Sequence, residues 1–271
     1  MIPLISLAKK MAATLSPQFA AWTVLRLSPL LALISSRHRE RFRLLRRLRG
    51  PSDTLMLGPF AGMRYLNFAV GSQLLPKFAG TYECELHEIL ARIVRLSPRV
   101  VVDIGSAEGY YAVGLALRIP QAHVFAFDLD RLGNALCRIL ARRNGVNDRV
   151  EIGVQCTSRT LEHLLASPPG TLIICDVEGA EDEILCPAST PSLQKASVLV
   201  EVHNDHRPGV SDRLNTRFQG THHIEVIQQA RRDPSMVPAK LAFTEAEAGR
   251  VMDEDRKGTQ QWFWMTPRLE C

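Results

Sequence analysis

Several features that would assign a chain to a well-known class are missing from this sequence. It has no uninterrupted apolar run of about 18 residues, since residues 19–34 contain Arg26 and Pro29, so we expect no membrane-spanning helix. The six cysteines show no C-x-x-C spacing, and several lie in apolar runs. This predicts buried thiols in a reducing compartment and no cysteine metal site. Internal repeats and low-complexity tracts are also absent.

Acidic residues are scarce in the first fifty positions. Glu40 stands alone there against ten basic residues, so this segment carries +9. Because the whole chain carries +5, residues 51–271 sum to −4. The positive charge follows the apolar stretch instead of preceding it, so we expect no secretory signal peptide. The expected location is the cytoplasm, where the protein could also bind the surface of a membrane.

Residues 1–50 are predicted to form a basic amphipathic helical extension with two pieces, about 4–15 and 17–48. One expected apolar face consists of Leu25, Leu30, Leu33, Phe42, Leu45 and Leu48. Such an extension can lie on an anionic membrane, bind nucleic acid or pack on a partner. It can equally be a solvated helix whose arginine stems cover apolar surface. The sequence leaves both interpretations open.

A second region, residues 51–98, is expected to pack on the core as a hairpin and a helix. The breaker cluster at 50–53 marks its start, and glycine turns within 54–66 indicate short strands. The helix is predicted to run from Thr81, as its N-cap, to Leu96. Thr81, Tyr82 and Glu83 could also line a pocket from above.

From residue 99 onward, short apolar runs alternate with helical stretches, and residues 99–271 are taken as one catalytic domain. Strands are predicted at 99–104, 122–128, 149–154, 171–176, 196–203, 223–228 and 260–266, with helices at 109–118, 130–144, 158–167 and 179–187. The alternation predicts an α/β fold with a parallel sheet covered on both faces. A long polar insert at 229–258 precedes the last strand.

The first strand runs into a glycine turn and then a helix, which is typical of a nucleotide-cofactor site. Asp103, Gly105, Glu108 and Gly109 form this turn, and the Gly-x-x-x-Gly spacing differs from the Gly-x-Gly-x-x-Gly of dinucleotide binders. An NAD-dependent oxidoreductase is therefore disfavoured. A plain strand-to-helix turn is the alternative to a cofactor site.

The second strand ends in Asp128, about twenty residues after the glycine turn. A carboxylate at this place can accept hydrogen bonds from both ribose hydroxyls of a nucleoside. The alternative is a helix N-cap, because a helix follows. We favour the ribose role.

Acidic residues and one histidine gather at two later strand ends. Five of the eight residues from Asp176 to Glu183 are acidic, and Asp176 and Glu178 come first, at the edge where open α/β sheets bind ligands. Glu201 and His203 lie in the last part of the fifth predicted strand at period-two spacing, so both point the same way from the sheet. His203 could take a proton from a substrate hydroxyl. A divalent ion among these residues is conceivable, but we assign no metal.

Together these stretches resemble the FkbM-type class I methyltransferases that use S-adenosylmethionine (SAM). The matching residues are Val102-Asp103-Ile-Gly105-Ser-Ala-Glu-Gly109-Tyr-Tyr111, Phe127-Asp128, Asp176-Val-Glu178-Gly179-Ala-Glu181 and Val200-Glu201-Val-His203. The resemblance covers about residues 99–204. It implies a Rossmann-like sheet of seven strands, the last antiparallel, with SAM at the carboxyl edge and methyl transfer to oxygen.

The resemblance also implies roles for individual residues. The cofactor-binding set would be Asp103, Gly105, Ser106, Glu108, Gly109, Tyr110, Asp128 and Asp176. Two departures are Ser106-Ala107-Glu108, where the family commonly has a small residue and then Asn, and Asp128 in place of Glu.

Methyl transfer needs an aligned nucleophile, excluded water and removal of one proton from an alcohol. We expect His203 or Glu178 to be the base, with Asp176 and Glu201 orienting substrate or base. The acceptor would be a small molecule or a glycan. One alternative is an RNA methyltransferase that uses the basic N-terminus, although the Asn/Asp-Pro-Pro-aromatic motif is missing. Another is a non-catalytic module at a membrane surface.

Overall fold

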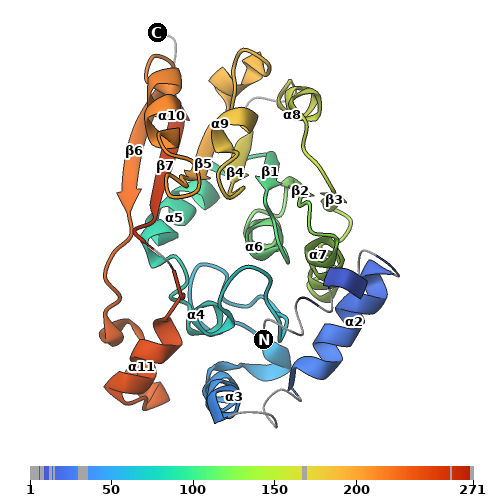
Figure 1. Cartoon of the computed structure of the whole chain (residues 1–271), viewed down its shortest axis with the longest axis vertical. Helices are drawn as coiled ribbons and strands as arrows, with labels where there is room; N and C mark the ends of the chain where they lie inside the picture. Colours follow the sequence, from blue (N-terminus) through green and yellow to red (C-terminus); the bar gives the residue numbers. More distant parts are fainter. Residues whose placement is uncertain are drawn as a thin grey trace.

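The computed structural model describes residues 6, 9–11, 14, 16–29, 36–166, 170–256 and 258–268. Its centre is a seven-stranded sheet in the order β3-β2-β1-β4-β5-β7-β6 (Figure 1). Six strands are parallel to one another, and β7 is antiparallel to both β5 and β6. The predicted Rossmann-like methyltransferase sheet, with its last strand antiparallel, is therefore confirmed. The strands are β1 (Val100–Ile104), β2 (His123–Phe127), β3 (Val150–Gly153), β4 (Leu172–Cys175), β5 (Ser197–Glu201), β6 (His222–Gln228) and β7 (Gln261–Pro267).

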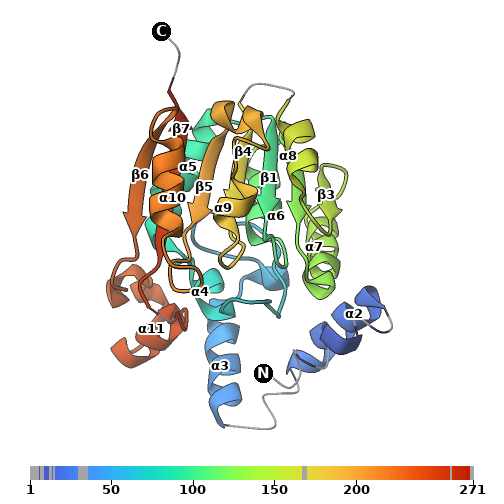
Figure 2. The same cartoon turned by 45° about the horizontal axis from the view of Figure 1, so that its top comes forward.

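Helices cover both faces of the sheet (Figure 2). One apolar cluster packs α5 (His87–Leu96), α6 (Tyr110–Arg118) and α7 (Arg131–Arg143) on one face. A second cluster packs α8 (Ser158–Leu165) and α10 (Val210–Phe218) on the other. Side chains from both sides of β1 and β4 are buried, which explains the continuous Val/Ile runs of these strands.

The N-terminal region forms separate helices, α2 (Pro17–Leu27) and α3 (Ser36–Leu48). The prediction of one helical piece over 17–48 was therefore wrong. Helix α2 ends at Leu27, with Ser28 as C-cap, because Pro29 supplies no backbone N–H to continue the helix. Within 4–15, the described residues 6, 9–11 and 14 are helical. Leu30 and Leu33 of the expected apolar face lie outside the described residues.

Residues 51–98 differ from the prediction in three ways. The expected hairpin is reduced to a single bridge between Thr54 and Arg64. The helix begins at His87 instead of Thr81, because Glu83 adopts a left-handed φ of 44° and a 3-10 turn at Cys84–Leu86 follows it. A short buried helix, α4 (Leu74–Ala79), was not anticipated.

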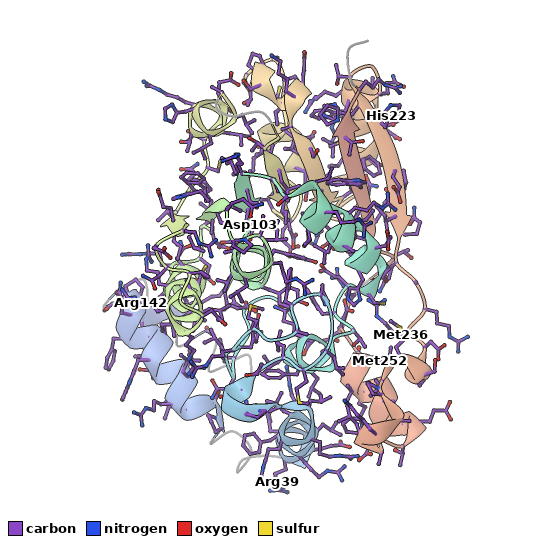
Figure 3. All side chains as sticks on the ribbon, turned by 180° about the vertical axis from the view of Figure 1, so that it is seen from behind. Arg39, Asp103, Arg142, His223, Met236 and Met252 are labelled. Carbon is purple, nitrogen blue, oxygen red and sulfur yellow. The ribbon has the colours of Figure 1, made fainter. Side chains whose placement is uncertain are left out.

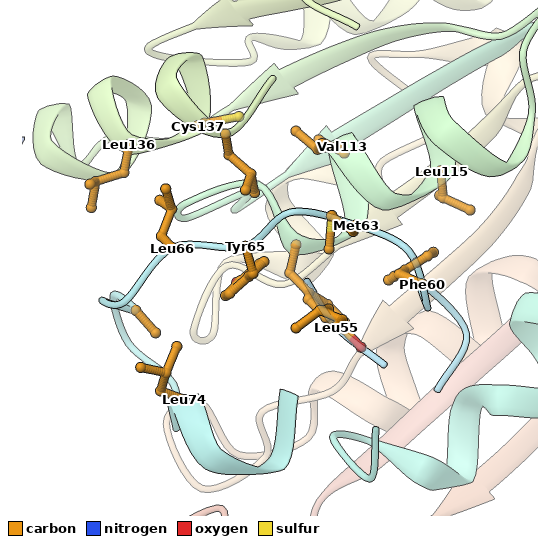
Figure 4. Packing of buried hydrophobic residues seen from close by; sticks show 14 of the residues in the cluster. Leu55, Phe60, Met63, Tyr65, Leu66, Leu74, Val113, Leu115, Leu136 and Cys137 are labelled. Carbon is orange, nitrogen blue, oxygen red and sulfur yellow. The ribbon is translucent and has the colours of Figure 1, made fainter. Parts of the chain in front are cut away.

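The loop closed by the Thr54–Arg64 bridge packs against α6, the helix that follows the glycine turn. Figure 4 shows Phe60 and Met63 beside Val113 and Leu115 of α6. A Cβ at Gly114 would lie only 2.5 Å from the Phe60 ring, so this glycine permits the close packing. The segment is thereby fixed next to the turn.

The polar insert before the last strand is partly helical. It contains α11 (Glu245–Met252), which starts with a capping box of Thr244 and Glu247, and 3-10 turns at Pro234–Met236 and Ala239–Leu241. Further 3-10 turns lie at Pro51–Asp53 and Pro191–Lys195. The predicted helix at 179–187 is only one turn, α9 (Glu181–Ile184). No helix in the described part of the chain is both long and apolar enough to cross a membrane.

Candidate functional site

The turn between β1 and α6 is locked against the neighbouring strands. Gly105 has a φ of 88°, and the N–H groups of Gly105 and Ser106 both donate to the Phe127 carbonyl, at 2.8 and 3.0 Å. A Cβ at position 105 would lie 1.6 Å from the Asp176 carbonyl oxygen. Gly109 has a φ of 93°, and a Cβ there would lie 2.5 Å from Cys137 Sγ. Both glycines are thus required by the packing of the protein itself.

A cavity of about 530 Å³ opens beside this turn, within the size range of small-molecule sites. Asp103 lies near the middle of the molecule (Figure 3), at the wall of this cavity. The predicted cofactor residues in its lining are Asp103, Gly105, Ser106, Glu108, Tyr110, Asp128 and Asp176, while Gly109 is not part of it. Of the predicted catalytic residues, Asp176 and Glu178 line the cavity, and Glu201 and His203 lie behind them.

Three polar atoms at the turn and at the end of β4 have no hydrogen-bond partner among the described residues: Asp103 Oδ2, Ser106 Oγ and Asp176 Oδ1. Burial raises the pKa of Asp103 to about 8, and the nearby Asp176 charge adds to the increase. Such atoms can accept hydrogen bonds from an ammonium or hydroxyl group of a ligand. The lining therefore fits a polar, positively charged compound.

Asp128 is held in place by backbone amides. Its Oδ2 accepts from the Ala107 N–H at 2.7 Å, and its Oδ1 accepts from the Asp130 N–H at 2.6 Å. The N-cap of α7 is Asp130, which accepts from the Leu132 N–H. The alternative in which Asp128 caps the helix was therefore wrong, and its ribose role stays a prediction.

Glu108 is fully buried and makes three hydrogen bonds within the protein. It accepts from Tyr65 Oη (2.5 Å), the Val70 N–H (2.9 Å) and Lys77 Nζ (2.5 Å). The Lys77–Glu108 ion pair fixes α4 to the turn. Sequence reasoning missed Lys77, although a lysine inside the apolar run Leu-Leu-Pro-Lys-Phe-Ala was a usable signal. Direct contact of Glu108 with a cofactor stays a prediction.

His203 lies at the centre of an acidic cluster. Its Nδ1 donates to Glu181 Oε1 at 2.6 Å, and the Glu181 carboxylate is fully buried. Its Nε2 lies 3.7 Å from a carboxylate oxygen of each of three further acids, Asp176, Glu178 and Glu201. The sequence analysis grouped Asp176, Glu178, Glu201 and His203 correctly, but it did not predict the bond from Glu181 to His203.

These neighbours determine the protonation of the cluster. Burial lowers the pKa of His203, but the bond to Glu181 and the charges of Asp176 and Glu201 outweigh it and raise the pKa to about 9. Burial raises the pKa of Asp176 to about 7, against the lowering effect of His203. At neutral pH His203 therefore carries a proton, which disfavours it as a proton acceptor. Asp176, Glu178 and His203 place ligand atoms within 4.8 Å of one another, but a protonated Nε2 offers no lone pair to a metal.

A buried ion network is joined to the cluster through Glu201. Arg256 donates to Glu201 (2.6 Å), to Glu254 (2.8 Å) and to Glu83. Arg232 donates to Glu254 at 2.5 Å, and Tyr111 Oη donates to Glu83. Sequence reasoning did not find Arg256, because it lies in the polar insert, 55 residues from its partner Glu201. The network keeps Glu201 next to a cation.

Comparison with known proteins gives partial matches. No family model matches the chain. The mouse catechol O-methyltransferase domain-containing protein 1 is 30% identical over 102 residues, which are 36% of this chain and 39% of that protein. The O-methyltransferase from Bacillus cereus in complex with SAH superimposes with a TM-score of 0.45 at 14% identity, covering 66% of this chain and 78% of that one. A SAM-dependent methyltransferase from Geobacter sulfurreducens in complex with S-adenosyl-L-homocysteine gives 0.41 at 16% identity, covering 69% and 91%. The chain thus spans about two fifths of the curated relative that it matches.

Proposed function

We propose that this chain is a class I SAM-dependent methyltransferase of the FkbM type that methylates a hydroxyl oxygen of a small-molecule or sugar-containing acceptor. One observation carries the proposal: the glycine turn and the acidic edge of the histidine cluster line the same cavity. A cofactor held by the turn would therefore face the residues that can remove a proton.

The cofactor side of the cavity is formed by residues with fixed positions. The unpartnered atoms of Asp103 and Ser106 would accept hydrogen bonds from the amino-acid end of SAM. Asp128, anchored by two backbone amides, would accept from the ribose hydroxyls. When bound, SAM supplies a methyl group on a positively charged sulfur. The acidic lining would attract that charge.

On the reaction side, Asp176 is the best-placed proton acceptor. It lines the cavity, its Oδ1 accepts no hydrogen bond from the described residues, and its pKa of about 7 makes the carboxylate both present and basic at neutral pH. The acceptor hydroxyl would give its proton to this oxygen as the methyl group is transferred. The His203 imidazolium, held by Glu181, would orient Asp176 from behind and favour its ionised form.

Calorimetric titration with S-adenosylhomocysteine tests the proposal. We expect binding to the wild-type chain, at least tenfold weaker binding to Asp128→Asn, and unchanged binding to Asp148→Asn, which alters an exposed acid away from the cavity. A wild-type chain that is folded by circular dichroism but binds neither SAM nor S-adenosylhomocysteine would contradict the proposal.

A further inference from the structure

Helix α2 presents its large apolar side chains to the outside. Its inner face consists of Ala20, Ala21 and Val24, which are fully buried where α2 packs beside α7 (Figure 1). Phe19 and Trp22 are 51% and 53% exposed, and Leu27 is 40% exposed. A solvated amphipathic helix has the opposite arrangement, with polar side chains outside. The outer face of α2 is therefore built for contact with something other than water.

The spacing of these side chains makes them one surface. Phe19, Trp22 and Arg26 follow each other at i, i+3 and i+7, so they share a face of the helix. The two rings stack at 6.2 Å between centroids, and the Arg26 guanidinium lies 5.3 Å from the Trp22 ring centroid. Arg26 is the only charged residue in α2. The face therefore joins aromatic groups to a cation.

The charge around this face is mainly positive, although Glu40 lies in α3 and Arg43 pairs with Glu247 of α11 at 2.8 Å. Helix α3 lies at the same end of the molecule as α2 in Figures 1 and 2, and Figure 3 places Arg39 at that end. Arg39, Arg43 and Arg46 of α3 are exposed. Residues 1–50 contain Glu40 as their single acid and sum to +9. A partner that suits this end of the molecule carries negative charge.

We propose that the outer face of α2, with the exposed arginines of α3, binds the surface of an anionic lipid bilayer. Phenylalanine, tryptophan and leucine side chains enter the boundary between headgroups and acyl chains, and arginines bind the lipid phosphates. A bilayer can accept Leu27 and both rings together with the arginines, whereas the bases of a nucleic acid would stack on the rings and leave Leu27 in water. The inference goes beyond the proposed function and does not depend on it.

The protein contains its own reporter for this binding. Of its three tryptophans, Trp22 is exposed, while Trp262 and Trp264 are buried at 2% and 4% exposure. A change in fluorescence on adding vesicles therefore reports on Trp22. We expect a blue shift and co-sedimentation with vesicles of equal phosphatidylcholine and phosphatidylglycerol. Binding to phosphatidylcholine alone should be about tenfold weaker or more, and high salt should weaken binding to the anionic vesicles.

Matched variants distinguish binding through this surface from nonspecific hydrophobic binding. Phe19→Ser/Leu27→Ser keeps the reporter and the buried face of α2, and should weaken vesicle binding at least about tenfold. Leu96→Ser, at the end of α5, removes a side chain that is 63% exposed and should change nothing. Circular dichroism of each variant verifies that it is folded.

Three results would overturn the inference. One is no blue shift with anionic vesicles. Another is a blue shift without vesicles that grows with protein concentration, accompanied by a dimer in sedimentation velocity, because the face would then bind a second copy. The third is salt-sensitive binding of RNA without binding of vesicles. Since no assay here contains cofactor, failure of the proposed methyltransferase activity would leave the result readable.

Discussion

Nδ1 of His203 lies 2.6 Å from Oε1 of Glu181, inside the protein and away from the cavity. The bond fixes the orientation of the imidazole, so that Nε2 points toward Asp176, Glu178 and Glu201. It also supports the charged form of the ring, and this determines which group of the cluster can accept a proton.

Glu181→Gln is expected to lower the pKa of His203 from about 9, because the substitution removes the negative partner of Nδ1. Titration of the histidine ring resonances by NMR measures this change directly. His222 is the internal control, since its ring bonds to the Ala196 carbonyl and Thr221 and its lowered pKa should stay the same. An unchanged His203 titration would show that Glu181 does not support the imidazolium.

The same bond predicts a pH dependence of stability. The folded-state pKa of His203 is raised above its ordinary value of 6.5, so its contribution to stability is complete below pH 6.5 and is lost as the pH rises to about 9. Chemical denaturation between pH 6 and 9.5 should show this loss in the wild type and a smaller loss in Glu181→Gln. Equal slopes for the two proteins would speak against the assignment.

Asp103→Asn should stabilise the fold at pH 7 to 8. Burial raises the pKa of Asp103 to about 8, so the folded state retains a proton that the unfolded chain has released, and stability falls between about pH 4 and 8. Asparagine removes this dependence. Urea denaturation at pH 5 and pH 8 should show a larger gain at pH 8. In the proposed function, the same variant binds S-adenosylhomocysteine more weakly.

Arg256→Met is expected to cost about 3–5 kcal/mol of unfolding free energy, because it leaves Glu83, Glu201 and Glu254 without their shared cation. Arg92→Met provides the matched control. Arg92 makes a two-bond pair with Glu225 at the surface, and its loss should cost less than about 1 kcal/mol. Equal costs in chemical denaturation would mean that the Arg256 network adds nothing beyond a surface pair.

Gly105→Ala and Gly145→Ala separate steric clash from backbone strain. Both glycines have positive φ, 88° and 66°, but a Cβ at 145 meets nothing within 4 Å, whereas one at 105 would overlap the Asp176 carbonyl. We expect a cost of about 1 kcal/mol for Gly145→Ala and several times more for Gly105→Ala. Thermal denaturation of the two variants makes the comparison, and similar melting temperatures would exclude the clash.

The sequence predicted the sheet well because its signals are local. Each strand is a short apolar run, and the acids at residues 128 and 176 mark strand ends, so the order of elements follows from the pattern. The antiparallel β7 came from the family resemblance and is confirmed by its pairing with β5 and β6. The predicted limits of the N-terminal helices were wrong, because Pro29 ends α2 although the apolar periodicity on either side of it favours one continuous helix.

The site was predicted less completely, because its remaining parts are long-range. Lys77 reaches Glu108 across 31 positions, and Arg256 reaches Glu83 across 173. No rule of sequence spacing connects residues that lie so far apart in the chain. They pair because an unpaired charge is costly to bury. The raised pKa of His203 could not be predicted from the sequence either, because it depends on the bond to Glu181. In the sequence Glu181 is an ordinary acid in the first turn of a helix.

The contact between position 105 and the Asp176 backbone limits how this site can change during evolution. The glycine turn and the end of β4 form one steric unit, so position 105 cannot accept a side chain unless the Asp176 backbone moves. In the proposed function, changes of acceptor specificity are therefore expected at Gly71, Ser72 and Tyr82, which line the cavity from irregular segments around α4. A mutational library restricted to Gly71, Ser72 and Tyr82 would vary this part of the lining and leave the turn, Lys77 and Glu83 unchanged.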